Sequence, residues 1–100
     1  MVDSSIIETA RKYTSLIPDY LLLKKAYLFG SHSTGTARED SDIDIALIIG
    51  NMGNFNETQM QLMRLRRAID LRIEPHPISV DDFNELNPFV YELKRTGIEL

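Results

Sequence analysis

Cysteine is absent from the sequence. Disulfide bonds, cysteine-ligated zinc sites and thiol nucleophiles are therefore excluded, and nothing in the composition indicates secretion. The N-terminal segment also lacks the basic residues and the long apolar stretch of a signal peptide, and it carries Asp3 and Glu8 instead. These absences predict a cytoplasmic protein.

Positive charge and long apolar runs are also scarce. The chain has 11 Lys and Arg residues against 15 Asp and Glu residues, which gives a formal net charge of −4. Binding a long nucleic acid requires many basic contacts to phosphates, so this balance argues against such a partner. The longest apolar runs, at 21–23 and at 43–49 with Asp44 inside it, are far too short to span a bilayer. We therefore expect neither a long nucleic acid nor a membrane as a partner.

The sequence is long enough for one small domain. Its 100 residues are 43% hydrophobic and 26% charged, which is close to the average for globular proteins. A chain of this length can bury a single hydrophobic core, and no internal repeat is visible. We therefore expect one domain over residues 1–100.

Apolar periodicity predicts helices and strands in a mixed order. Pro75 and Pro77 are expected to stop the third strand. The resulting order predicts an α+β fold, in which helices pack on a small mixed sheet. The predicted elements are, in order, a helix over 5–17, strands over 26–29 and 42–49, a helix over 57–67, a strand over 69–74, and two short helices that begin near 79 and 87.

Polar residues mark where these helices are expected to begin. Ser5 and Glu8 have the spacing of a capping box. Asn56 is the expected cap of the middle helix, and Asn87 with Pro88 at the first helical position is expected to start the last one. Each signal predicts a helix start independently of the hydrophobic pattern.

Four residues form the pattern that indicates chemistry: Gly30 and Ser31, then, after ten intervening residues, Asp42 and Asp44. Residues i and i+2 of a strand point to the same face, so the two carboxylates project together from backbone positions about 7 Å apart. Carboxylate oxygens suit Mg²⁺, which usually takes one or two of them plus substrate phosphate oxygens. A two-metal site clamps the attacking and leaving oxygens of an in-line phosphoryl displacement. Without Gly30 and Ser31, the two aspartates could equally be residues that cap a loop at the start of a strand.

The turn after the first strand is expected to bind phosphate. Gly30 lets the backbone approach a ligand closely, and Ser31 adds a hydroxyl and backbone N–H groups. Arg38, in the following loop, is either a phosphate contact or a solvated charge.

A two-metal site requires a third carboxylate from a neighbouring strand. Asp70 and Glu74 both lie on one face of the expected third strand. If the intervening helix makes a parallel crossover, the starts of the two strands meet at one end of the sheet, and Glu74 lies about 13 Å beyond Asp70. This reasoning favours Asp70 and leaves Glu74 as the alternative.

The motif resembles the signature of the polymerase-beta-type nucleotidyltransferase superfamily. The matching residues are Gly30–Ser31, Gly35 and the run Ser41–Ile45, and the short length resembles the minimal nucleotidyltransferase branch. The resemblance implies the palm-like fold of that superfamily and Mg²⁺-dependent nucleotidyl transfer from an NTP, with ATP preferred and two ions held by the aspartate pair. Ile69–Ile73 resembles the strand that supplies the third carboxylate, which supports Asp70. The run Arg72–His76 resembles a recurring feature of one bacterial subgroup, which keeps Glu74 open.

The resemblance also implies a protein partner. In the minimal branch, a separate helical HEPN-type toxin often accompanies the transferase, which then acts as an antitoxin by attaching AMP to a toxin tyrosine. Two alternatives remain: modification of a small molecule together with a helical subunit, and a protein-binding module that neutralises its partner sterically. The steric alternative stays open because the loop has little positive charge with which to bind a triphosphate. Family members often carry a basic residue near Thr34, whereas the only basic side chain in this loop, apart from His32, is that of Arg38.

Overall fold

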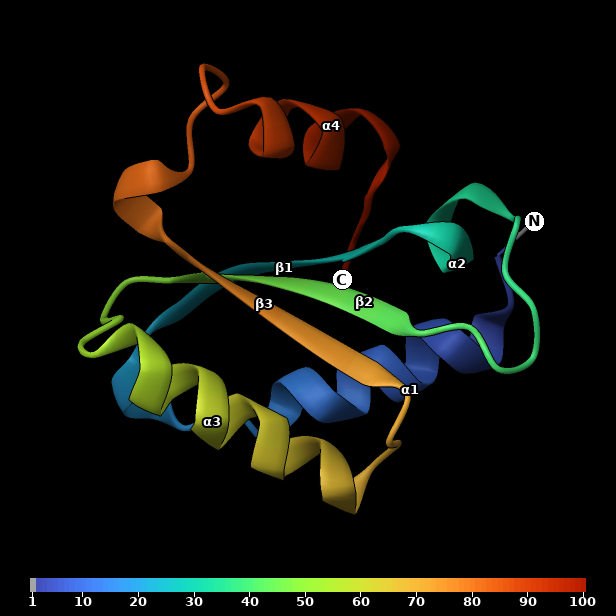
Figure 1. Ribbon diagram of the computed structural model, residues 1–100, viewed down its shortest axis with the longest axis horizontal. Helices are drawn as coiled ribbons and strands as arrows, with labels where there is room; N and C mark the ends of the chain where they lie inside the picture. Colours follow the sequence, from blue (N-terminus) through green and yellow to red (C-terminus); the bar gives the residue numbers. More distant parts are fainter. Residues whose placement is uncertain (1) are drawn as a thin grey trace.

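The structure, a computed structural model, describes residues 2–100. A four-stranded sheet forms the middle layer, and helices lie on both of its faces (Figure 1). The elements are, in order, α1 (Ser4–Ser15), η1 (Asp19–Leu21), β1 (Leu23–Phe29), α2 (Ser31–Thr34), β2 (Ile43–Ile49), α3 (Phe55–Leu65), η2 (Arg66–Ala68), β3 (Ile73–Ser79), η3 (Val80–Asp82), α4 (Pro88–Thr96) and β4 (Ile98–Glu99). No helix between residues 2 and 100 is long and apolar enough to cross a membrane.

The sheet is mixed, with strand order β3-β2-β1-β4. Strand β1 runs antiparallel to both β2 and β4, whereas β2 and β3 are parallel. A parallel pair requires a crossover connection, and α3 supplies it. The predicted α+β fold with a small mixed sheet is therefore confirmed.

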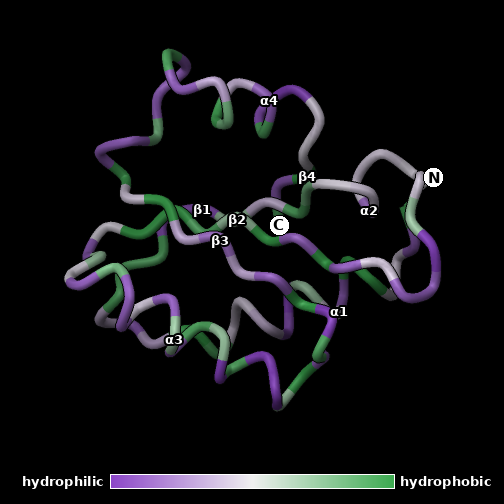
Figure 2. The backbone as a smooth tube through the Cα atoms, in the orientation of Figure 1, coloured by the Kyte–Doolittle hydropathy of each residue, from purple (hydrophilic) through white to green (hydrophobic). Residues whose placement is uncertain are grey.

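The alternation of residues in β2 divides the molecule into two apolar layers. One face of the strand carries Ile43, Ile45, Leu47 and Ile49, all fully buried against α1 and α3. The other face carries Ala46 and Ile48, which pack with Leu93 of α4. In Figure 2, hydrophobic residues, coloured green, lie along β1 and β2 in the middle of the molecule. Because Asp44 belongs to the same alternation as Ala46 and Ile48, its side chain lies on the α4 side of the sheet.

The predicted bounds of the third strand are wrong. Residues 66–68 form the short helix η2, and β3 begins only at Ile73 and continues through Pro75 and Pro77. Two side chains donate to carbonyl oxygens on the outer edge of β3: Arg66 Nη1 to Ile73 O at 3.0 Å, and Gln59 Nε2 to Pro75 O at 3.2 Å. An edge strand needs no N–H at its outward-facing positions, so proline is tolerated there.

The capping predictions are correct in part. Asn87 caps α4, with Pro88 in the first turn, as predicted. Helix α1 is capped by Asp3, which accepts from Ser5 N at 2.9 Å, so the expected Ser5 cap lies inside the helix. Helix α3 is likewise capped two residues early, by Asn54, which accepts from Glu57 N at 3.0 Å. In both cases an equivalent capping residue lies two positions nearer the N-terminus, and local sequence does not distinguish between them.

Candidate active site

The Gly30–Ser31 turn joins the end of β1 to α2. Gly30 has φ of 77° and ψ of −152°, a conformation that side-chain-bearing residues rarely adopt. Its carbonyl oxygen accepts hydrogen bonds from Ser33 N at 3.1 Å and from Ser33 Oγ at 2.9 Å, which closes the turn. The turn is therefore held by a backbone N–H and by the hydroxyl of Ser33.

Asp44 lies directly beneath this turn. It pairs with Phe29 across the antiparallel β1–β2 ladder, so it stands next to the strand end from which Gly30 departs. A Cβ atom built on Gly30 would lie 2.5 Å from Asp44 Oδ2. The absence of a side chain at Gly30 thus provides the space that the Asp44 carboxylate occupies. Asp42 lies two residues earlier, exposed, on the loop that leads into β2.

Glu74 and His76 reach the same face of the sheet from β3. In the parallel register, Asp44 pairs with Glu74, and Ala46 pairs with His76. His76 Nε2 lies 3.1 Å from Asp44 Oδ1, and the imidazole is the donor because an ionised carboxylate can only accept. Glu74 Oε1 lies 3.6 Å from Arg66 Nη1. Glu74 is therefore the backbone neighbour of Asp44 in the sheet, and its carboxylate contacts Arg66.

Asp70 lies elsewhere, in a turn three residues before β3. Both of its carboxylate oxygens bind Arg72: Oδ1 accepts from Nε at 3.1 Å and from the backbone N at 2.9 Å, and Oδ2 accepts from Nη2 at 2.8 Å. Arg72 Nη1 also donates to the Glu39 carbonyl at 2.8 Å. This Asp70–Arg72–Glu39 clamp ties the start of β3 to the loop that precedes Asp42.

The clamp predicts a specific acid sensitivity. Hydrogen bonds from Arg72 hold the pKa of Asp70 below its ordinary value. A carboxyl whose pKa is lower in the folded state than in the unfolded state stabilises the fold above the unfolded pKa, about 3.9, and loses that contribution as the pH falls through the folded pKa. The free energy of unfolding should therefore fall more steeply between about pH 5 and pH 3 in the wild type than in Asp70→Asn. Urea titrations at both pH values measure this difference, and equal slopes would contradict a stabilising role for the clamp.

The carboxylates on this face fit Mg²⁺ by their chemistry. Within residues 2–100, no three carboxylate or imidazole side chains stand together as a preformed metal cluster. Asp42, Asp44 and Glu74 nevertheless present only oxygen donors, which Mg²⁺ prefers, and it commonly takes one or two carboxylates and completes its shell with substrate phosphates. Asp44 Oδ2 fills the space left by the absent side chain of Gly30, so this carboxylate lies directly against the Gly30–Ser31 turn.

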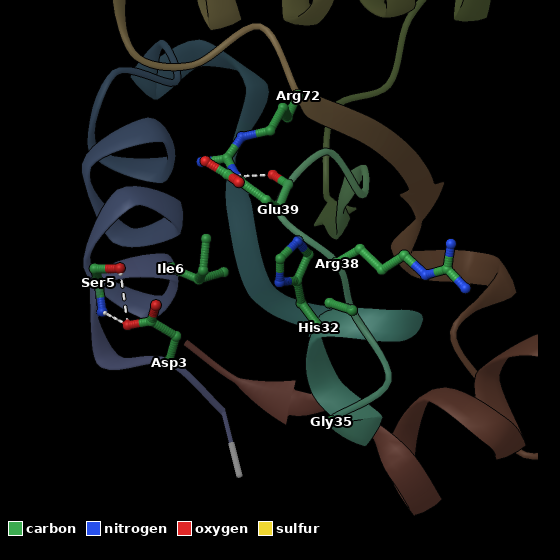
Figure 3. A pocket seen from close by; sticks show the side chains of 9 residues that line it. Asp3, Ser5, Ile6, His32, Gly35, Arg38, Glu39 and Arg72 are labelled. Carbon is green, nitrogen blue, oxygen red and sulfur yellow. Dashed lines mark hydrogen bonds between the residues drawn. The ribbon is translucent and has the colours of Figure 1, made fainter.

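Arg38 lines a pocket of about 370 Å³ between the start of α1 and the loop that precedes β2. Figure 3 shows its guanidinium extending away from His32 and Glu39. His32 is buried, and its Nε2 lies 3.3 Å from the Ser41 carbonyl, so it supports the loop from inside. The pocket is lined by Asp3, Ser5, Ile6, His32, Gly35, Ala37, Arg38, Glu39 and Arg72. Among the residues expected to form the active site, only Arg38 lines it.

His76 is the site residue that sequence reasoning missed. Because Pro75 and Pro77 are expected to stop the third strand, His76 falls outside its expected bounds of 69–74. If the alternation of β3 is continued through the prolines, Glu74 and His76 fall on one face, and this pattern could have identified His76.

The chain is similar to several known proteins. Residues 6–100 match the family described as "Polymerase beta, Nucleotidyltransferase". A protein of Methanocaldococcus jannaschii that bears the name "Putative protein adenylyltransferase" is 32% identical over 73 residues, which represent 71% of this chain and 73% of that protein.

Two crystal structures share the fold at 27% sequence identity. A variant of the MntA–HpeT toxin–antitoxin superposes with a TM-score of 0.57, over 100% of this chain and 72% of the compared chain. A toxin–antitoxin crystallised with AMP-PNP superposes with a TM-score of 0.58, over 96% of this chain and 69% of the compared chain. Together with the family match across residues 6–100, these similarities show that the chain belongs to the polymerase beta nucleotidyltransferase family and is a nucleotidyltransferase.

Proposed function

We propose that this nucleotidyltransferase transfers AMP from ATP to a hydroxyl group of a partner protein, and that it is the antitoxin of a pair with a helical HEPN-type toxin. The observation that carries the proposal is the position of Asp44 and Glu74, side by side in register next to the Gly30–Ser31 turn. The names of the relatives support the finer assignment, since one is called a protein adenylyltransferase and two structures are toxin–antitoxins, one of them with AMP-PNP.

The residues divide into two groups with different roles. Asp42, Asp44 and Glu74 would hold Mg²⁺, and bound Mg²⁺ would neutralise the charge that develops on the phosphates. Gly30 and Ser31 would bind the β- and γ-phosphates through backbone N–H groups and the serine hydroxyl. We assign the third carboxylate to Glu74 rather than to Asp70, because Arg72 already occupies both oxygens of Asp70.

The proposed reaction is a single displacement at phosphorus. The acceptor hydroxyl oxygen forms a bond to the α-phosphorus of ATP, and the bond between that phosphorus and the oxygen bridging to the β-phosphate breaks. Pyrophosphate leaves, and a carboxylate oxygen of Glu74 accepts the hydroxyl proton. The chain's own residues therefore contribute orientation of the phosphates, electrostatic stabilisation and one proton transfer.

The test uses ATP labelled in the α-phosphate and a co-expressed helical partner. Wild-type protein with Mg²⁺ is expected to label the partner, whereas samples with EDTA or with Asp42→Asn should not. Absence of labelling by the wild type, or equal labelling by Asp42→Asn, would contradict the proposal. If the doubly substituted Asp42→Asn/Asp44→Asn protein still neutralised the partner, steric neutralisation would replace catalysis as the explanation.

A further inference from the structure

His76 is held in a defined orientation by its surroundings. Its ring packs edge-on against Phe29, with centroids 4.9 Å apart and planes at 68°. Phe29 in turn packs edge-on against Phe89 of α4, at 5.2 Å. Pro75 and Pro77 flank His76 and restrict the backbone of β3 on both sides. The side chain is 44% exposed, and its contact with Phe29 and the restricted backbone of β3 orient the ring.

The oriented ring reaches across to β2. The residue paired with His76 is Ala46, whose side chain is a single methyl group, so the imidazole can extend past it towards Asp44, two residues earlier. The distance of 3.1 Å from Nε2 to Asp44 Oδ1 is that of a direct hydrogen bond.

The two oxygens of Asp44 therefore have different environments. Oδ1 accepts from His76, whereas Oδ2 lies in the space beside Gly30. In the proposed function, the phosphates and the metal would bind at the Gly30–Ser31 turn. A carboxylate with one oxygen held by a neighbouring side chain presents its other oxygen in a defined direction.

We propose that His76 is a positioning residue for Asp44. Its Nε2–H holds Oδ1 so that Oδ2 faces the Gly30–Ser31 turn, where Mg²⁺ would bind. This inference depends on the proposed function, because it assumes that Asp44 is a metal ligand. Residues that hydrogen-bond to metal ligands in this way commonly change metal affinity by about 10- to 100-fold when substituted.

Two substitutions separate the hydrogen bond from the packing. His76→Phe keeps an aromatic ring against Phe29 but removes the donor, whereas His76→Gln keeps an N–H donor at a similar reach and removes the ring. The readout is the dissociation constant of Mn²⁺, used as a probe for Mg²⁺, measured by calorimetry on the full chain with a non-hydrolysable ATP analogue. We expect His76→Phe to weaken Mn²⁺ binding about tenfold or more, and His76→Gln to bind within about threefold of the wild type.

Asp44→Asn is the matched control for the metal site itself. Loss of Mn²⁺ binding in Asp44→Asn together with wild-type affinity in His76→Phe would overturn the role of His76 and leave the proposed function intact. Equal weakening by His76→Phe and His76→Gln would also overturn it, because the N–H donor that His76→Gln retains would then give no benefit to Mn²⁺ binding. Full Mn²⁺ affinity in Asp44→Asn would overturn both the proposed metal site and this inference.

A second measurement does not depend on whether the variants fold. Nitrogen chemical shifts of the wild-type His76 ring at about pH 8, above the ordinary histidine pKa, report which ring nitrogen carries the proton. Protonation at Nε2 is expected, since that atom faces Asp44 Oδ1. Protonation at Nδ1 alone would overturn the proposal, because Nε2 could not then donate.

Discussion

Glu74→Gln is expected to reduce nucleotidyl transfer about a hundredfold or more, while Asp70→Asn should reduce it by less than about tenfold. The amide keeps the size of the Glu74 side chain but removes its negative charge and its capacity to accept a proton. Glu74 is the neighbour of Asp44 in the parallel register, and in the proposed function its carboxylate would complete the metal site. Asp70, by contrast, is occupied by Arg72 on both oxygens.

Transfer of the labelled nucleotide and thermal unfolding should be measured on both variants. Asp70→Asn is expected to lower the unfolding temperature while keeping most of the transfer activity, because it weakens the Asp70–Arg72 hydrogen bonds that hold Arg72 in place to reach the Glu39 carbonyl. Arg66→Met is the control for the ion pair of Glu74, since it removes the 3.6 Å contact but leaves the carboxylate in place. A large loss of transfer in Asp70→Asn with full activity in Glu74→Gln would reverse the assignment of the third carboxylate.

Gly30→Ala is expected to abolish most of the transfer activity and also to destabilise the fold. The new Cβ would lie 2.5 Å from Asp44 Oδ2, so the carboxylate would have to leave its position. The backbone conformation, with φ of 77° and ψ of −152°, adds a strain of about 1–3 kcal/mol for a residue with a side chain. We expect transfer to fall about a hundredfold, as for the loss of a well-placed catalytic group.

Gly53→Ala provides the matched control. Gly53 also has a positive φ, 58°, but nothing lies within 4 Å of a Cβ atom built there. This variant should lose about 1 kcal/mol of stability from backbone strain and keep wild-type transfer. Urea unfolding of both variants measures the cost of backbone strain, and the transfer assay measures the effect of displacing Asp44. If Gly30→Ala retained full activity, the close approach of Gly30 to Asp44 would have no role in catalysis.

Sequence reasoning predicted the features that depend on local pattern. The alternation of Ile43, Asp44 and Ile45 gave the correct faces of β2, and the Gly30 break after β1 gave the correct turn. Side-chain periodicity along a strand and the freedom of glycine at positive φ are local properties. A short stretch of sequence is therefore enough to predict both features.

The position of β3 could not be predicted in the same way. Proline is normally excluded from a strand, but Pro75 and Pro77 are tolerated because β3 lies at the edge of the sheet, and the position of a strand within a sheet is not visible in the sequence. The pairing of Asp44 with Glu74 depends on that strand and on the crossover through α3. Our proposal of Glu74 rather than Asp70 as the third carboxylate therefore depends on strand pairing, which the local sequence does not reveal.

The outer edge of β3 has a consequence for how this protein can associate. A second chain extends a sheet by exchanging backbone hydrogen bonds with an exposed edge, and such an edge can also lead to aggregation. Along β3, two prolines offer no N–H, and Arg66 and Gln59 already bind the Ile73 and Pro75 carbonyls. Strand addition at this edge is therefore blocked, so a toxin or a second copy that approaches β3 must be recognised through side chains rather than through a shared sheet.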